Sequence, residues 1–228
     1  MSLFNKEEFI KFLIDNHVVG FFDKPVKLKS GRMSHWYVNW RIVCGDVFLI
    51  DRLADFLIDF IKDHEFTPEA FYGVPEGATK LGIIATYKWA KAEPGFTKGT
   101  NVLSMGRGKP KEHGASQDRF FLTPPCGKIV VVEDVTTTGG SLLATLDQLA
   151  EMDVEVLAAV GLTNRMELCD NGKSVEAAVK EKGISYLTLS KATDFLPEAY
   201  RTLAPGEHIG KAIEKEFAEY GVENIKLR

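Results

Sequence analysis

The strand, loop and helix around residue 130 constrain the fold more than any other part of the sequence. Residues 129–132 read IVVV, an apolar and largely β-branched run, and a helical run, SLLATLDQLAEM, begins at Ser141. A continuously apolar strand is typical of a parallel sheet that has helices on both faces. This stretch therefore predicts an α/β fold.

The same alternation recurs along most of the chain. Further strands are predicted at EAFYGV, NVLSM, VEVLAAVGLT and ISYLTL, and further helices at ATKLGIIATYKWA, SVEAAVKEKG and residues 207–220. Alternating strands and helices indicate a parallel sheet with helices on both faces. Ligands of such sheets bind beyond the carboxyl ends of the strands. We therefore expect the chemistry in the loops after Val74, Met105, Asp134 and Thr163.

Two N-terminal helices carry start signals. Asn5 stands three residues before Glu8, as in a capping box. Asp46 is placed to cap a second helix, whose apolar stripe comprises Ile50, Leu53, Ala54, Leu57 and Ile61. The 228 residues suit one compact domain with a full hydrophobic core.

Charge and composition exclude several classes of partner. The net charge of -4 argues against a nucleic-acid partner, because such domains usually carry a basic excess. No stretch reaches the roughly 18 apolar residues that a membrane span needs, and MSLFNKEEFI is not a signal peptide. Cys44, Cys126 and Cys169 have no metal-ligand spacing and are interpreted as isolated thiols. We expect a cytoplasmic protein.

The loop EDVTTTGGS, which follows the apolar strand, is the sharpest functional signal. Its glycines let the backbone curl, so that N–H groups of the loop and of the helix N-terminus converge on an anion. The two carboxylates before the loop suit the hydroxyls of a phosphorylated ribose. The alternative is a structural turn with capping threonines. The candidate residues are Glu133, Asp134, Val135, Thr136, Thr137, Thr138, Gly139, Gly140 and Ser141.

This loop resembles the phosphoribosyl-pyrophosphate (PRPP) motif of the type I phosphoribosyltransferases. The resemblance implies that the acidic pair meets the ribose hydroxyls and that the loop binds the 5-phosphate. It also implies that family's fold, with a central, mostly parallel sheet flanked by helices, a small N-terminal hood segment and a flexible catalytic loop. The hood segment would span about residues 1–45, and the core about residues 46–228.

A basic segment, SMGRGKPKEHGASQDRF, narrows the choice of base. It resembles the mobile catalytic loop of the orotate phosphoribosyltransferases, written R-K-x-x-K-x-H-G, with Arg107, Lys111, His113 and Gly114 at matching positions. Gly108 replaces the second basic residue of that pattern. Basic groups here would stabilise the charge on a departing diphosphate, and closure of the loop would exclude water. The alternative is a solvated surface loop.

Two further segments support the same family. LKSGRMSHWYVN resembles a substrate-binding stretch in which Lys29 would be the substrate lysine, and Tyr37 with Val38 would flank the base. In PEGATKLG, Thr79 and Lys80 match a position whose lysine meets pyrophosphate. The alternatives are a lysine beside an ordinary turn and an exposed helix lysine.

An arginine after a strand end completes the predicted site. Arg165 lies in GLTNRME, and the resemblance implies that it pairs with the carboxylate of orotate, because a planar guanidinium suits bidentate binding. Asn164 stands where the family usually has aspartate. The alternative is a surface arginine.

The resemblance implies transfer of the phosphoribosyl group from PRPP to orotate, giving orotidine 5'-phosphate and pyrophosphate. Mg²⁺ would be held mainly through PRPP, since this ion relies on substrate phosphates for ligands. The family also implies a homodimer in which the catalytic loop is shared between subunits. Two alternatives remain at this point: transfer to another base such as a purine, or a non-catalytic regulator that senses PRPP.

Overall fold

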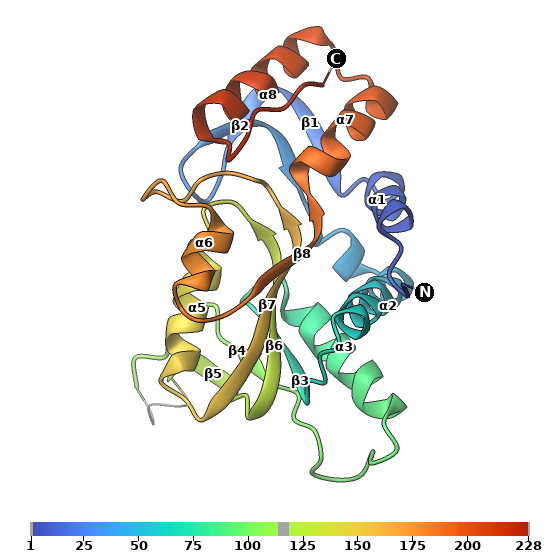
Figure 1. Cartoon of the computed structure of the whole chain (residues 1–228), viewed down its shortest axis with the longest axis vertical. Coiled ribbons are helices and arrows are strands. Elements are labelled where there is room, and N and C mark those ends of the chain that lie inside the picture. Colours follow the sequence, from blue (N-terminus) through green and yellow to red (C-terminus); the bar gives the residue numbers. More distant parts are fainter. Residues whose placement is uncertain (1, 114–118, 228) are drawn as a thin grey trace.

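The computed structural model describes residues 2–113 and 119–227. Its centre is a four-stranded parallel sheet in the order β3-β6-β7-β8, which Figure 1 shows running through the middle of the molecule. The strands are β3 (Ala70–Gly73), β6 (Gly127–Thr136), β7 (Val154–Asn164) and β8 (Tyr186–Lys191). The predicted α/β fold with a central parallel sheet is confirmed.

The centre of strand β6, residues 129–132, is apolar because both faces of the strand are buried there. Val130 and Val132 point into one core, which also contains side chains of α2 and α3. Ile129 and Val131 point into a second core, which is shared with α5 and α6. These helices cover the two faces of the sheet: α2 (Val47–Asp63), α3 (Thr79–Ala92), α5 (Gly140–Ala150) and α6 (Val175–Lys180).

An antiparallel hairpin lies beyond the carboxyl ends of the sheet strands and combines with the C-terminal part of the chain (Figure 1). Trp36 of the hairpin stacks on Phe217 of the last helix, with ring centroids 6.2 Å apart. This unit therefore draws on both ends of the sequence, and the predicted division at about residue 45 stays a prediction. Its elements are α1 (Lys6–Asp15), β1 (Val19–Lys27), β2 (Met33–Val38), η1 (Val43–Gly45), α7 (Ala192–Leu203) and α8 (Glu207–Tyr220).

The predicted helix starts are confirmed by their cap hydrogen bonds. The side chain of Asn5 accepts from Glu8 N at 3.1 Å, and that of Asp46 accepts from Leu49 N at 2.9 Å. All five residues of the stripe predicted after Asp46 are buried. None of the described helices combines the length and apolar character that crossing a membrane requires.

One predicted element needs correction, and one helix was not predicted. The strand predicted at NVLSM is wrong for most of its length: only Met105–Gly106 (β4) is extended, and it pairs with β5 (Phe121–Thr123) in a separate two-stranded sheet. Within this run only Ser104 is buried and Leu103 is half-exposed, so the run has no apolar face against the core. Helix α7 was not among the predicted elements; it contains Pro197 and buries Phe195, Leu196 and Ala199 at helical spacing.

Candidate functional site

A cavity of about 860 Å³ opens between the hairpin and the carboxyl ends of the sheet strands. Its volume falls in the range of pockets that hold a small ligand. Four segments that are distant in the sequence contribute its walls. The lining residues are Leu28, Lys29, Ser30, Tyr37, Val38, Asn39, Arg41, Pro75, Glu76, Gly77, Glu133, Asp134, Val135, Thr137, Thr138, Gly139, Gly140, Ser141, Ala144, Arg165 and Asp170.

The predicted phosphate loop forms one wall of this cavity. Gly139 has a φ of 72°, a left-handed conformation that lets the loop turn into the first residue of α5. The N-terminus of α5 and the hydroxyls of Thr137, Thr138 and Ser141 border the cavity, as an anion cradle requires. Thr136 is different: its hydroxyl lies 2.6 Å from that of Tyr186, and both are buried away from the cavity.

The two carboxylates border the cavity beside the loop. Glu133 is 5% exposed, and burial raises the pKa of its carboxyl group well above the usual range, with the charge of Asp134 adding to the rise. The loop after β3 packs against Asp134, and a Cβ atom on Gly77 would lie only 2.2 Å from Asp134 Oδ2. A glycine at position 77 is therefore what allows this close approach.

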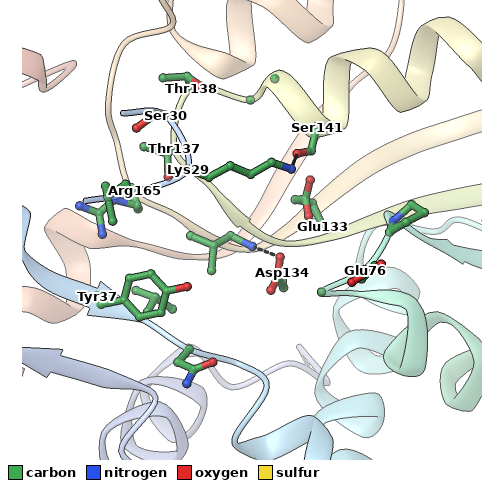
Figure 2. A pocket seen from close by; sticks show the side chains of 18 of the residues that line it. Lys29, Ser30, Tyr37, Glu76, Glu133, Asp134, Thr137, Thr138, Ser141 and Arg165 are labelled. Carbon is green, nitrogen blue, oxygen red and sulfur yellow. Dashed lines mark hydrogen bonds between the residues drawn. The ribbon is translucent and has the colours of Figure 1, made fainter. Parts of the chain in front are cut away.

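Lys29 connects the hairpin side of the cavity to the predicted phosphate loop. Its Nζ donates to Ser141 Oγ at 2.8 Å, although 112 residues separate them in the sequence. Figure 2 shows this lysine reaching across the cavity, with Tyr37 and Arg165 on one side and Glu76 on the other. Tyr37 and Val38 also line the cavity, so the structure brings the predicted base-flanking residues next to the predicted phosphate loop.

Arg165 is a buried residue, so its alternative interpretation as a surface arginine is wrong. It is 1% exposed, and its guanidinium carbon lies 3.6 Å from the centroid of the Trp36 ring. Its Nε donates to Glu167 Oε1 at 2.8 Å, Nη2 to Ser34 Oγ at 3.0 Å and Nη1 to Trp36 O at 3.3 Å. Burial lowers the pKa of Arg165, and the nearby Glu167 carboxylate opposes that shift. The residue contributes to the cavity wall while its side chain is committed to protein partners.

The other carboxylate oxygen of Glu167 extends this network. Arg32 Nη1 donates to Glu167 Oε2 at 2.9 Å, and Arg32 Nη2 donates to Leu168 O at 2.8 Å. On the far side, Glu216 of α8 accepts from Ser34 Oγ at 2.8 Å. The side chains of Arg32, Arg165, Glu167 and Glu216 thus connect the hairpin, the end of β7 and α8.

Several predicted residues do not line the cavity in this single chain. Lys80 is exposed and Thr79 is half-buried at the start of α3, while Glu76 and Gly77 of the preceding loop form the wall instead. Arg107 Nε donates to Phe121 O at 3.2 Å, and Lys111 N donates to Arg119 O at 2.9 Å. His113 is also absent from the lining set. Gly114 lies outside the described residues.

Sequence reasoning missed five polar residues of the cavity wall, Ser30, Asn39, Arg41, Glu76 and Asp170. A signal for Asn39 was present: side chains two residues apart in extended chain point to the same side, and Asn39 comes two residues after Tyr37. Arg41 lies in the turn that follows β2, where its Nη2 donates to the hydroxyl of Tyr37 at 2.9 Å. Glu76 offered no comparable signal, because it follows β3 in an irregular loop.

Comparison with known proteins identifies the family. No family model matches the chain. An orotate phosphoribosyltransferase of Bradyrhizobium sp. (strain ORS 278) is 35% identical over 176 residues, which cover 75% of this chain and 88% of that protein.

Solved structures agree in fold. Orotate phosphoribosyltransferase from Aeropyrum pernix superposes with a TM-score of 0.64 at 23% identity, covering 87% of this chain and 99% of the other. Leishmania donovani UMP synthase gives a TM-score of 0.68 at 17% identity, over 93% of this chain but only 42% of that longer one. The fold, the cavity and the sequence similarity together show that the chain belongs to the orotate phosphoribosyltransferase family.

Proposed function

We propose that this protein transfers the phosphoribosyl group of PRPP to orotate, giving orotidine 5'-phosphate and pyrophosphate in pyrimidine biosynthesis. The observation that carries the proposal is the cavity itself. The loop after Asp134, two carboxylates and a lysine from the hairpin surround one space of about 860 Å³. The 5-phosphate of PRPP suits the loop after Asp134, and the ring of orotate suits the hairpin wall.

The phosphate loop would bind the 5-phosphate of PRPP through Thr137, Thr138 and the N–H groups around Gly140. Glu133 and Asp134 would hold the ribose hydroxyls. As the bond from the anomeric carbon to pyrophosphate breaks, the sugar gains positive, oxocarbenium-like character. A carboxylate beside the ring favours that charge, and a nitrogen of orotate then bonds to the anomeric carbon.

Lys29 is the lysine best placed to serve this reaction. Its ammonium group lies at the N-terminus of α5, where the phosphate loop ends, and it extends from the hairpin wall that carries Tyr37 and Val38. In the proposal it contacts substrate, while Tyr37 and Val38 flank the orotate ring. The predicted role of Arg165, recognition of the orotate carboxylate, remains part of the proposal.

Mg²⁺ would enter with the substrate. The structure describes no group of three or more His, Cys, Asp or Glu side chains that could hold a metal ion. Mg²⁺ often binds through substrate phosphates and one or two carboxylates, and the oxygens of Glu133 and Asp134 are the kind of ligand it accepts. When bound to PRPP, the ion would neutralise charge on the diphosphate.

The basic loop would act on the site of a neighbouring subunit. Arg107, Lys111 and His113 do not line the cavity of their own chain, and Lys80 lies beside it. The proposal therefore includes a homodimer in which each loop supplies charge for the diphosphate leaving the other site. The protein would work in the cytoplasm, where PRPP and orotate are available to it.

A reconstitution assay tests the proposed reaction. Purified protein is mixed with PRPP, Mg²⁺ and, in separate reactions, orotate, uracil, adenine and hypoxanthine, and nucleotide and pyrophosphate are measured. Orotate should give both products in equal amounts, and omission of Mg²⁺ should stop the reaction. Product from a purine but not from orotate would overturn the proposal, as would PRPP binding without product from any base.

Mixing two inactive variants tests the shared loop. Lys111→Ala should lower turnover about 100-fold or more with little change in substrate binding, because its contact would form in the reacting state. Asp134→Asn damages the cavity instead. If loops are exchanged, mixed dimers of the two variants contain one intact site and regain up to about a quarter of wild-type activity. No recovery after subunit exchange, verified by mass spectrometry of the mixed dimers, would contradict sharing.

A further inference from the structure

The positive charges that line the cavity differ in how far the protein has already neutralised them. Among the described lining residues, the cations are Lys29, Arg41 and Arg165. Arg165 forms an ion pair with Glu167 inside the protein. Lys29 donates to Ser141 of the predicted phosphate loop. Arg41 takes part in no ion pair within residues 2–113 and 119–227.

Arg165 presents little of its guanidinium to a ligand. Nε, Nη1 and Nη2 each donate to a protein acceptor, and the Trp36 ring covers one face of the group at 3.6 Å. The residue is 1% exposed. A carboxylate in the cavity would need to break part of this buried network to receive a pair of N–H groups from it.

Arg41 has the opposite properties. Its side chain is exposed, and its two hydrogen bonds go to neutral groups: Nη2 donates to Tyr37 Oη at 2.9 Å and Nε donates to Asn39 Oδ1 at 3.3 Å. These bonds hold the guanidinium against the residue proposed to flank the base. Nη1 and the second hydrogen of Nη2 remain, and together they form one edge of the guanidinium fork that can bind a carboxylate through two parallel hydrogen bonds.

We infer that Arg41 is a specificity-determining residue that pairs with the carboxylate group of the base. Tyr37 and Asn39 orient the guanidinium, and the Arg165 network holds the hairpin strand that carries them. This inference rests on the proposed function, since it assigns a partner to the carboxylate of orotate. It adds a second arginine to the proposed carboxylate site: Arg165 is held in the cavity wall by its protein partners, and Arg41 keeps one edge of its guanidinium for the substrate.

Steady-state kinetics of Arg41→Gln test the inference. Glutamine keeps a polar side chain of moderate length but loses the charge and the fork. The Michaelis constant for orotate should rise about 30-fold, equivalent to about 2 kcal/mol at 1.4 kcal/mol per tenfold change. The Michaelis constant for PRPP should stay within about twofold. Arg41→Lys should recover part of the loss, because it restores the charge without the bidentate geometry.

Uracil, the same ring without the carboxylate, provides the decisive comparison. Its inhibition constant against orotate should be equal in wild type and Arg41→Gln, because the missing contact involves only the carboxylate. The matched control is Arg52→Gln, which removes an exposed arginine that pairs with Glu8 outside the cavity lining. This variant should behave like wild type with orotate, PRPP and uracil.

Three outcomes would overturn the inference. Arg41→Gln could leave the Michaelis constant for orotate unchanged, could weaken orotate and uracil equally, or could weaken PRPP instead of orotate. The last result would place Arg41 at the diphosphate. A wild-type protein that makes no nucleotide from orotate is a separate result, which contradicts the proposed function itself rather than the role of Arg41 within it.

Discussion

The two sides of the cavity are built in different ways. The side proposed to bind phosphate, called the phosphate side, is one continuous stretch from Glu133 to Ser141, whose strand, turn and helix are local structures. The base side is assembled from the hairpin, the end of β7 and α8, and its central residue, Arg165, contacts Ser34 and Trp36 about 130 positions away in the sequence. A local site tolerates loss of a ligand-binding group without unfolding, whereas an assembled site depends on the bonds that hold its parts together.

The charge network on the base side has the larger structural consequence. Glu167 is 7% exposed and bridges Arg165 and Arg32. Removing one member of a buried ion pair leaves a charge without its partner in a medium that solvates it poorly. The phosphate side contains no comparable charged bridge among the described residues, and the hydroxyls of Thr137, Thr138 and Ser141 border the cavity.

Glu167→Ala should therefore show the largest effect on stability. We expect it to lower the free energy of unfolding by about 3–5 kcal/mol, the usual range for breaking a buried pair. Urea denaturation followed by circular dichroism measures the change. Glu181→Gln, which interrupts the exposed pair with Lys173, is the matched control and should change stability by less than about 1 kcal/mol. Equal losses in both variants would remove the distinction between the two sides.

Asp134→Asn should show the reverse pattern on the phosphate side. We expect kcat/KM for PRPP to fall about 100-fold, since the carboxylate would stabilise a charge that develops in the reacting sugar. The free energy of unfolding should change by less than about 1 kcal/mol, because Asp134 is half-buried and borders the cavity. Thermal melts beside the kinetics separate the two effects, and a large loss of stability would show that Asp134 belongs to the scaffold.

Arg165→Ala tests the predicted part of Arg165 in recognition. A selective rise in the Michaelis constant for orotate is expected, together with lower stability, because Ser34 and Glu167 lose their partner. The double variant with Arg41→Gln sharpens the result. If Arg165 acts only by holding the hairpin, the two losses in orotate binding should be strongly non-additive. Equal effects of Arg165→Ala on both substrates would contradict a role in carboxylate recognition.

Glu133→Gln should have the smallest effect of the four variants, and it should raise the stability of the folded protein rather than lower it. Because the folded-state pKa of Glu133 is raised, the folded protein binds more protons than the unfolded chain once the pH exceeds the usual value of 4.5. Wild-type stability therefore falls as pH rises from 4.5 to the raised pKa, and the glutamine variant escapes this loss. Without ligands, Glu133→Gln should melt higher than wild type at neutral pH, and the gain should vanish below pH 4.5. A gain that persists in acid would rule out titration of Glu133 as its cause.

Much of the fold followed from the sequence because its signals are local. The apolar run before Glu133 predicted a strand buried on both faces, and the caps at Asn5 and Asp46 predicted where two helices begin. The misplaced strand before Met105 and the unforeseen helix α7 show the limit of such signals. A short apolar run forms a sheet strand only if a neighbour is free to pair with it, and helix α7, which contains Pro197, is stabilised by tertiary packing.

The sequence by itself determined the strand, turn and helix around Glu133 to Ser141, the parallel sheet and the family resemblance, since each depends on residues that are close together in the chain. Tertiary structure decided which cations face the cavity. It buried Arg165 against Trp36 and Glu167, brought Lys29 to Ser141, left Lys80 outside the wall and placed Arg41 within it. The exposure of a charged side chain depends on every segment that packs around it. These segments come together only when the chain has folded.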